Sequence, residues 1–366
     1  MAKATNEQAG DRAAHGRPPL RGEDADTLRH YYYQMQLIRR FEERAREMYT
    51  KAKIGGYCHD NLGEEATIVG LLAALAPEDY LFTNYREHGY MLARGGAPSR
   101  VMAELFGKET GVSRGRGGSM HLFDAAVHFM GGYGIVGGQL PLAVGAAFAL
   151  KYQQRPGVVV CQLGDGTTNI GAWHESLNLA KIYQLPALFF IVNNGYGMGT
   201  TVAEAAAEPE LYKRGCAFRI HGERIDGRDV LAVRGAVRRL RQRAQEAYEP
   251  AILEAISFRF RGHSVVDADH YRDPEEVKQG RTADPVSLFA TTLMDAGLVD
   301  DAWLQAIASR VERELQEAID FADSSPDPQI EDLFAYMYAT PVPNTPGAAD
   351  ARAIAQQAHG GRSPCQ

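Results

Sequence analysis

Two short segments, Gly164-Asp165-Gly166 and Asn193-Asn194, combine residue types that can hold a metal ion and a phosphate group. Asp165 offers a carboxylate and Asn194 a side-chain carbonyl, and both are hard oxygen ligands of the kind that Mg²⁺ prefers. Two protein ligands are typical of a Mg²⁺ ion that completes its shell with phosphate and water. Each segment taken alone is also a common turn. The placement of the two segments in the fold therefore decides whether they form a ligand site or are ordinary turns.

Apolar runs place both segments at the ends of buried strands. Residues 158–163 and 187–192 are typical of strands in a parallel sheet, and the pattern of residues 172–183 predicts a helix between them. A third strand is predicted over residues 251–256. This alternation predicts an α/β fold with a mostly parallel sheet and helices on both faces. Because ligands bind beyond the carboxyl ends of such strands, we expect the two segments to lie side by side there.

The remaining chain predicts further helices and a glycine-rich stretch. Periodic apolar residues predict helices over residues 27–50, 63–75, 141–152 and 229–247. Residues 111–145 are rich in glycine, but the apolar residues between the glycines indicate a packed segment rather than a loose surface loop. We also expect a helix to begin near Thr167, with the free N–H groups of its first turn binding a phosphate group.

Composition divides the chain into one large domain with a tail at each end. Residues 1–26 are polar and predict a disordered N-terminal arm. Residues 27–340 are predicted to form a single α/β domain, and the proline- and alanine-rich residues 341–366 a flexible C-terminal tail.

Charge and composition exclude several classes of function. The formal net charge of −7 argues against nucleic-acid binding, and we interpret the arginines between 234 and 243 as a solvated helix face. No apolar stretch is long enough for a membrane span. Acidic residues near the N-terminus are untypical of a secretory signal or mitochondrial transit peptide, so we expect a cytoplasmic protein. The 4 cysteines are scattered, which argues against a disulfide framework or a zinc site.

A longer ordered set of motifs resembles the alpha subunits of thiamine-diphosphate-dependent 2-oxo acid dehydrogenases, of the pyruvate dehydrogenase type. The two segments described above match the cofactor-binding motif of that family, and the resemblance runs from about Gly56 to Tyr271. The other matching motifs are Cys58-His59, Gly63-Glu64-Glu65-Ala66, Tyr85-Arg86-Glu87-His88-Gly89, Gly117-Gly118-Ser119-Met120-His121, Gly134-Ile135-Val136-Gly137 and Arg261-Gly262-His263-Ser264.

The resemblance implies the thiamine-diphosphate-binding fold and a role for each matching residue. Asp165, Asn194 and the carbonyl of Tyr196 would ligate Mg²⁺. His59 and His263 match the catalytic histidines. The implied cofactor contacts are Tyr85, Arg86, Gly166 and Thr167 at the diphosphate, Gly134 and Val136 at the aminopyrimidine ring, and Asn194 and His263 beside them. By contrast, we interpret His30, His128 and His221 as ordinary core or surface residues.

The resemblance also implies a reaction and partners. The reaction would be oxidative decarboxylation of pyruvate, with transfer of the acyl group to a lipoyl group on an acyltransferase component. Family enzymes need a glutamate that a different domain contributes, and this chain predicts only one α/β unit. A separate beta subunit would therefore supply that glutamate, in a heterotetramer of two alpha and two beta subunits. The apolar residues within 140–150 and 172–179 are either subunit contacts or ordinary core.

Several residues depart from the family pattern. Glu64 in place of a common glutamine is neutral, since both residues occur in the superfamily, but Asp60-Asn61-Leu62 replaces the usual Leu-Tyr-x after the histidine. Acetoin and branched-chain 2-oxo acids therefore remain alternative substrates. A nicotinamide-dependent oxidoreductase is a different class, but the glycines at 131–138 do not follow the first strand as its fingerprint requires. A non-catalytic scaffold is the third interpretation, and the intact set of candidate residues argues against it.

Overall fold

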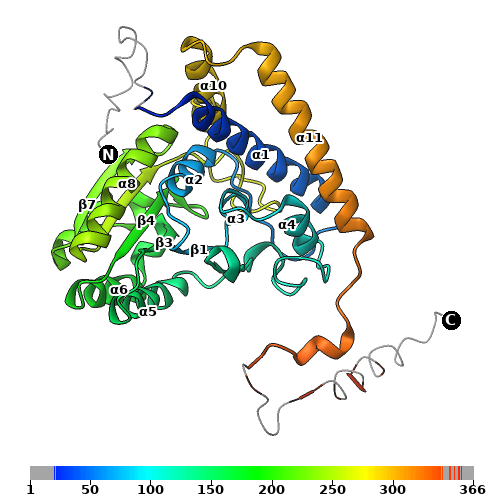
Figure 1. Ribbon diagram of the computed structural model, residues 1–366, viewed down its shortest axis with the longest axis horizontal. Helices are drawn as coiled ribbons and strands as arrows, with labels where there is room; N and C mark the ends of the chain where they lie inside the picture. The colour runs from blue at the N-terminus through cyan, green and yellow to red at the C-terminus, as the bar shows by residue number, and fades with distance from the viewer. Residues whose placement is uncertain are drawn as a thin grey trace.

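A six-stranded parallel sheet forms the centre of the part of the chain that the computed structural model describes, which is residue 20, residues 22–338 and a few further positions between 340 and 356. The strand order is β2-β1-β3-β4-β8-β7 (Figure 1), and every pairing in this sheet is parallel. The strands are β1 (Tyr80–Asn84), β2 (Phe129–Tyr133), β3 (Val159–Gly164), β4 (Ala187–Asn193), β7 (His221–Asp226) and β8 (Ala251–Ile256). The predicted α/β fold is thus confirmed.

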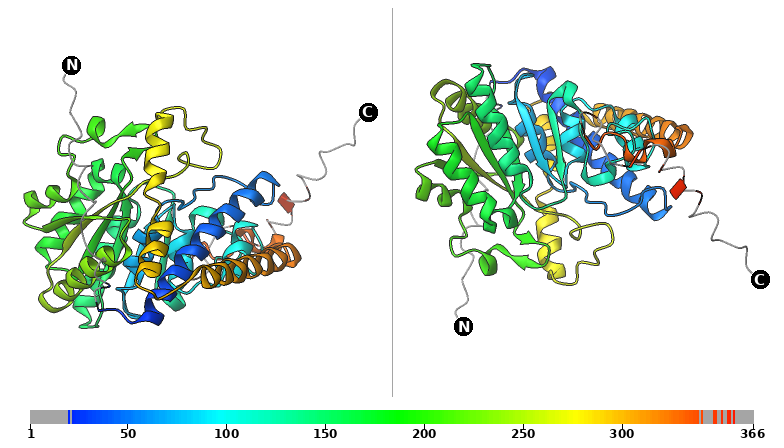
Figure 2. Two further views of the ribbon diagram at one scale, coloured as in Figure 1. Left: turned by 90° about the horizontal axis from the view of Figure 1, so that it is seen from above. Right: turned by 90° about the horizontal axis from the view of Figure 1, so that it is seen from below.

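Alternate residues of the central strands bury their side chains against helices on the two faces of the sheet. On one face, Val160 and Phe190 belong to a core shared with the first, second and eighth helices; on the other, Cys161 and Phe189 pack with the fifth and sixth. Helices therefore cover both faces (Figure 2), and the central strands are apolar throughout. The helices are α1 (Ala25–Thr50), α2 (Glu65–Leu72), α5 (Gln139–Tyr152), α6 (Gly171–Ile182) and α8 (Val230–Ala247).

Two long helices, α1 and α11, lie against each other on the outside of the first of these faces (Figures 1 and 2). The hydroxyl of Tyr33 donates to the Glu314 carboxylate at 2.6 Å, and Arg40 pairs with Glu312 at 2.6 Å. Aspartate side chains cap helix starts, as at Asp24 and Asp300, by accepting hydrogen bonds from free N–H groups of the first turn. The remaining helices of at least six residues are α3 (His88–Ala93), α4 (Pro98–Leu105), α9 (Pro274–Thr282), α10 (Pro285–Asp295) and α11 (Asp301–Ser324).

Short elements connect these larger ones. A small antiparallel hairpin of β5 and β6 follows β4, just beyond the Asn193-Asn194 segment. The short elements are η1 (Gly118–Met120), η2 (Ala125–Val127), η3 (Asp165–Asn169), β5 (Tyr196–Gly197), β6 (Thr200–Thr201), α7 (Val202–Ala205), η4 (Leu211–Phe218) and η5 (Ile330–Phe334).

The predicted strands and helices are confirmed, with ends shifted by up to three residues, but three strands of the six-stranded sheet were not predicted. β1 has only five residues, β2 contains two glycines, and β7 is a polar edge strand. None of these carries a strong apolar run. The expectation that apolar residues of the glycine-rich stretch are buried holds for Phe129 but is wrong for Ile135, which is 78% exposed, and for Val136.

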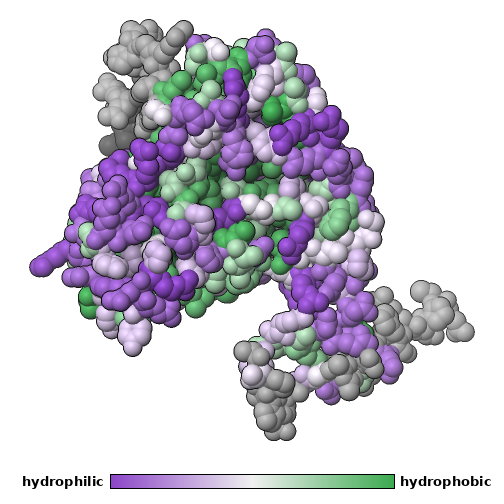
Figure 3. All heavy atoms as spheres, in the orientation of Figure 1, coloured by the Kyte–Doolittle hydropathy of each residue, from purple (hydrophilic) through white to green (hydrophobic). Residues whose placement is uncertain are grey.

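Polar side chains cover most of the face shown in Figure 3, and apolar ones gather towards its middle. The basic side chains of α8 have acidic neighbours: Arg239 pairs with Glu223, and Arg243 with Glu249. In the described part of the chain, no helix is both long and apolar enough to cross a membrane.

The predicted terminal segments fall largely outside the described residues. Residues 1–19 and 21 of the predicted arm lie there, and so does most of the predicted tail, 341–366. The helix α1 begins at Ala25, two residues earlier than predicted, so the last part of the predicted arm is helical.

A buried aspartate joins the starts of two strands to α8. Asp79 is fully buried, and its carboxylate accepts hydrogen bonds from the N–H groups of Ala76 and Val158 at 2.7 and 2.9 Å. Its charge pairs with Arg241, at 3.0 Å from Nη2. These contacts link β1, β3 and α8 at the end of the sheet opposite the carboxyl ends of the strands.

We expect Asp79→Ala to lower the free energy of unfolding by about 3–5 kcal/mol, because it leaves two N–H groups without an acceptor and leaves Arg241 with only the more exposed Glu78 as a partner. Urea unfolding of the purified protein measures this. Glu78→Ala is the matched control, since Glu78 lies 3.3 Å from the same arginine but is 41% exposed; its effect should stay below about 1 kcal/mol. Equal losses in the two variants would contradict this account of Asp79.

Candidate active site

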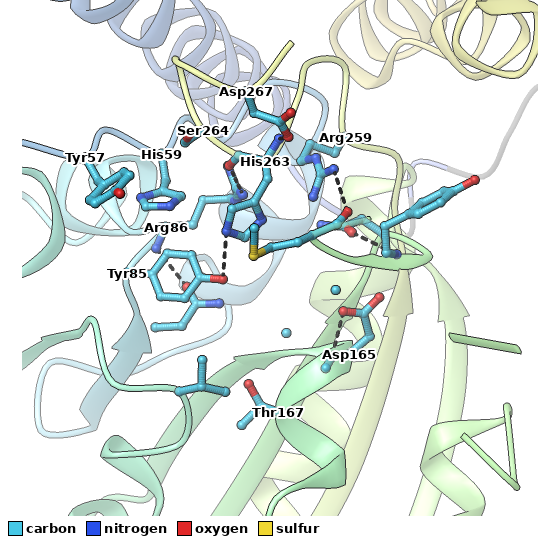
Figure 4. A pocket seen from close by; sticks show the side chains of 18 of the residues that line it. Tyr57, His59, Tyr85, Arg86, Asp165, Thr167, Arg259, His263, Ser264 and Asp267 are labelled. Carbon is cyan, nitrogen blue, oxygen red and sulfur yellow. Dashed lines mark hydrogen bonds between the residues drawn. The ribbon is translucent and has the colours of Figure 1, made fainter. Parts of the chain in front are cut away.

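A cavity of about 630 Å³ opens where five neighbouring strands reach their carboxyl ends. Loops after β1, β2, β3, β4 and β8 contribute to its lining, which is the place where parallel sheets bind ligands. All the residues to which the resemblance assigns a site role line this one cavity (Figure 4): His59, Tyr85, Arg86, Gly134, Val136, Asp165, Gly166, Thr167, Asn194, Tyr196 and His263.

Asp165 carries a buried oxygen that lacks a protein partner. The residue is 5% exposed, and its Oδ1 accepts a hydrogen bond from the N–H of Gly166 at 2.7 Å. Its Oδ2 is buried and has no hydrogen-bond partner within the described residues. Burial raises the pKa of this carboxyl to about 6. An unpaired buried acid of this kind suits a positive charge that binds beside it.

The Asn194 side chain has a fixed neighbour on one side. Its Nδ2 donates to Oε1 of Glu64 at 3.1 Å, and its Oδ1 lies 3.4 Å from the N–H of Tyr196. Asp165 follows β3 directly and Asn194 follows β4 directly, and these two strands are paired. The expectation that the two segments lie side by side is therefore confirmed.

The segment after Asp165 differs from the prediction. Residues Asp165–Asn169 form the 3₁₀ turn η3, and the helix α6 begins only at Gly171. A helix does open at this segment, as expected, but it is a short 3₁₀ helix and not the start of α6. The reason is local, because the Thr168 hydroxyl bonds back to the carbonyl of Asp165 at 2.8 Å and closes the turn. Arg214 reinforces it by donating to the Thr168 carbonyl at 2.6 Å.

Arg86 is nearly buried and is held by two carbonyl groups. Its guanidinium donates to the carbonyl of His263 at 2.8 Å and to the carbonyl of Asp60. These bonds join the segments that carry His59 and His263. They also place a permanent positive charge beside the cavity.

Two histidines and a tyrosine form a close group on one side of the cavity (Figure 4). The ring centroids of His59 and His263 are 5.0 Å apart, and those of His59 and Tyr85 are 4.5 Å apart. The Tyr85 hydroxyl lies 3.5 Å from Nε2 of His263. The Nδ1 atoms of both histidines are buried without a hydrogen-bond partner in the described chain. Such atoms are available to a bound ligand.

The electrostatics of this group keep both imidazoles neutral. Burial lowers the pKa of His59 to about 2, and the positive charge of Arg86 acts in the same direction. Burial and Arg86 likewise lower the pKa of His263 to about 4. Near neutral pH each ring therefore has one nitrogen that donates and one that accepts. Strongly shifted pKa values that cluster in one cavity are typical of an active site.

The cavity also contains residues to which the sequence analysis gave no role. Arg259 is 1% exposed and donates to the Tyr271 hydroxyl at 2.7 Å. It follows β8, so the rule that ligands bind beyond strand ends was a signal that could have identified it. Asn84 ends the unpredicted strand β1, and no local signal pointed to it. The other such lining residues are Tyr57, Met120, Gly164, Gly197, Met198, Ser264 and Asp267.

The histidines interpreted as ordinary residues lie outside this cavity. The Nδ1 of His128 lies 2.9 Å from the Pro77 carbonyl, which accepts its hydrogen bond, and the ring stacks on Tyr80. His221 pairs with Glu223 on an edge strand. Among the described residues, no cluster of three or more His, Cys, Asp and Glu side chains is arranged to hold a metal ion. The candidate metal ligands are of another kind, since they comprise one carboxylate, one amide oxygen and one backbone carbonyl.

The shifted pKa of Asp165 predicts a pH-dependent gain in stability when its charge is removed. Because the folded-state pKa of about 6 lies above the ordinary value of 3.8, stability is lost as pH rises through that interval. In cofactor-free, metal-chelated protein, Asp165→Asn should therefore stabilise the fold near pH 7 by up to about 3 kcal/mol, and not near pH 4.

Urea unfolding at the two pH values measures this difference. Asp267→Asn is the matched comparison, and its free energy of unfolding near pH 7 should change in the opposite direction. Burial alone would raise the pKa of Asp267, but hydrogen bonds from Tyr271, Asp269 and His263 lower it to about 2, so its loss should destabilise the protein near pH 7. A gain for Asp165→Asn that is equal at both pH values would contradict the prediction.

Comparison with known proteins agrees with this geometry. A family model described as "Dehydrogenase E1 component" matches residues 33–331. The chain is 43% identical over 347 residues to the pyruvate dehydrogenase E1 component subunit alpha of Zymomonas mobilis, covering 91% of this chain and 98% of that protein. It is 41% identical over 304 residues to the protein of the same name from Rhizobium meliloti, covering 83% and 87%. The chain therefore belongs to the dehydrogenase E1 component family, and this membership implies dependence on thiamine diphosphate.

Proposed function

We propose that this chain is the alpha subunit of a pyruvate dehydrogenase E1 component that binds thiamine diphosphate through Mg²⁺. It would decarboxylate pyruvate and pass the acyl group to a lipoyl group on an acyltransferase partner. The names of the relatives support the substrate. The observation that carries the site is the buried, unpartnered Oδ2 of Asp165 on the cavity wall.

The candidate metal ligands fit a hard divalent cation. Asp165 contributes the unpartnered carboxylate oxygen, Asn194 its Oδ1, and Tyr196 its backbone carbonyl, all from loops that follow β3 and β4. A cation there would supply the positive charge that the buried carboxylate lacks. Mg²⁺ needs further oxygen ligands, and the diphosphate and water would provide them.

The rest of the cavity fits the other parts of the cofactor. Gly166 and Thr167 present backbone and a hydroxyl next to the cation ligands, and Tyr85 and Arg86 face them across the cavity. Gly134 and Val136 would contact the aminopyrimidine ring. When bound, thiamine diphosphate supplies the electron sink for decarboxylation.

His59 and His263 would act on the substrate as neutral imidazoles. Each can donate a hydrogen bond to the oxygen on which negative charge develops, and accept a hydrogen bond at its other nitrogen, at neutral pH. The charge of Arg86 opposes their protonation, which keeps the accepting nitrogen free. The side chains of Asp60 and Asn61 are not part of the cavity lining, so these departures from the family pattern do not argue against pyruvate.

A beta subunit would complete the site. None of the described residues that line the cavity is a glutamate, so the glutamate that the family needs would come from a partner. Ile135 and Val136 at the cavity, and Leu142 and Phe148 on α5, are exposed apolar residues that a partner would cover. We propose the heterotetramer of two alpha and two beta subunits on this basis.

Titration calorimetry of the chain co-purified with its beta subunit tests the proposal. Binding of thiamine diphosphate should require Mg²⁺, and the same sample should turn over pyruvate with a dye acceptor. Turnover of acetoin or branched-chain 2-oxo acids instead would keep the site and change the substrate. No binding would overturn the proposed function.

We expect Asp165→Ala to abolish Mg²⁺-dependent binding of thiamine diphosphate, because it removes the charged ligand of the cation. Calorimetry with and without chelator measures this. Asp320→Ala, on the exposed side of α11, is the control and should bind as the wild type does. Unchanged affinity in Asp165→Ala would remove this residue from the site.

We expect His263→Ala to retain cofactor binding and to lower kcat by about 10²–10⁴-fold, because a positioned proton donor or acceptor contributes rate enhancement of that order. Steady-state turnover and calorimetry on the same preparation separate the two effects. His30→Ala, which changes an exposed histidine of α1, should be fully active. Full activity of His263→Ala would refute its catalytic role.

A further inference from the structure

We propose that Glu64 is a positioning residue that determines which atom of the Asn194 side chain faces the metal ion. The inference rests on the Mg²⁺ site of the proposed function. Glu64 is 2% exposed and is absent from the cavity lining, so it would act through Asn194 rather than on the cofactor. Three side chains, Asn61, Glu64 and Asn194, are hydrogen-bonded in a row, and each bond has a donor end and an acceptor end.

Backbone groups fix the orientation of the first amide. Asn61 is fully buried, and its Oδ1 accepts a hydrogen bond from the N–H of Gly89 at 3.1 Å. Its Nδ2 lies 3.3 Å from the carbonyl of Arg86. A backbone N–H can only donate and a carbonyl can only accept, so a flipped Asn61 amide would face like groups on both sides. The Nδ2 atom must therefore point towards Glu64.

Glu64 then accepts from both neighbours. Its Oε2 accepts from Nδ2 of Asn61 at 3.2 Å, and its Oε1 accepts from Nδ2 of Asn194 at 3.1 Å. A carboxylate has only acceptors, so it requires the NH₂ group of Asn194 on its side. The carbonyl oxygen Oδ1 of Asn194 is thereby directed to the other side, towards the cavity, where the N–H of Tyr196 lies 3.4 Å from it and favours the same orientation.

A glutamine at position 64 cannot do the same while Asn61 is present. If its oxygen faces Asn194, its NH₂ group meets the fixed NH₂ group of Asn61. If its oxygen faces Asn61, its NH₂ group meets Asn194 and favours the flipped amide, which turns an NH₂ group towards the cation. The first arrangement places two NH₂ groups against each other beside Asn61, and the second weakens the metal site, because the flipped amide also turns its NH₂ group towards the N–H of Tyr196. Asn61 departs from the family pattern, and its contact with Glu64 couples the two positions.

The test uses Glu64→Gln in the co-purified alpha–beta enzyme. We expect the Mg²⁺ concentration for half-maximal binding of thiamine diphosphate to rise about 10–100-fold, the range typical of lost partners of metal ligands. Mn²⁺ binding in the presence of thiamine diphosphate, followed by electron paramagnetic resonance, gives the metal affinity without reference to turnover. The thermal unfolding midpoint of the metal-free variant reports whether the fold itself has changed.

The double variant Asn61→Asp with Glu64→Gln is the matched rescue. It exchanges carboxylate and amide between the two positions and conserves the total charge. The introduced carboxylate would accept from the N–H of Gly89 and from the NH₂ group of the introduced glutamine, whose oxygen is then free to face Asn194. We expect this exchange to recover at least half of the lost metal affinity on a logarithmic scale. Recovery is not complete, because the new carboxylate and the Arg86 carbonyl are both acceptors and lie close together.

The outcomes separate this inference from the proposed function. If the wild-type enzyme binds thiamine diphosphate without Mg²⁺ dependence, the metal site itself is overturned. If wild-type binding requires Mg²⁺ and Glu64→Gln binds both ligands equally well, only the role of Glu64 is overturned. A loss in Glu64→Gln that the double variant does not reverse at all would also overturn it, because the direction of the hydrogen bonds would then not be the cause.

Discussion

The in-register parallel pairing of β3 and β4 is the constraint on which the site depends. Gly164 lies opposite Val192 in this pairing, so Asp165 leaves the sheet one residue later and Asn194 two residues later, on neighbouring strands. Hydrogen bonds in the sheet and apolar burial on both faces hold this register, because a shift of one residue would turn each strand's side chains to the wrong face. Rigid strand ends thus bring together ligands that lie far apart in the sequence.

Burial shifts the pKa values of the polar groups at the site, and it also makes the site without ligand less stable. The same removal from water raises the pKa of Asp165 and lowers the pKa of His59 and His263. Asp165 without a cation is therefore an unpaired acid, whereas the histidines stay neutral near pH 7, each with one donor and one acceptor nitrogen. The fold tolerates this because the surrounding sheet and helices are extensively packed. Stability is lower at the site than a fully paired arrangement would give, and ligand binding would restore it.

Much of the fold and the candidate lining could be predicted from the sequence, for different reasons. The central strands were recognisable because both of their faces are buried and their sequences are apolar throughout. β2 and β7 were not recognisable, since glycines and polar edge residues weaken the local pattern, and their pairing depends on distant strands. Asp165 and Asn194 could be placed together because the carboxyl ends of adjacent parallel strands share one edge.

Local sequence pattern could not predict the hydrogen bonds that orient the side chain of Asn194. Glu64 meets Asn194, and Asn61 meets Gly89 and Arg86, only after the chain has folded. The sequence shows which residue types stand at these positions, but it does not show which way their hydrogen bonds run.

That direction matters because an amide has two chemically different ends of nearly the same shape, and only one of them can bind a cation. Packing alone cannot distinguish the two orientations of Asn194. A buried carboxylate can, because it accepts hydrogen bonds and never donates them. Backbone groups of Arg86 and Gly89 begin the sequence of hydrogen bonds, and the same Arg86 side chain connects the two histidine segments. The loop after β1 therefore contributes to both halves of the site: it orients the candidate metal ligand through its backbone and holds the histidines through its guanidinium.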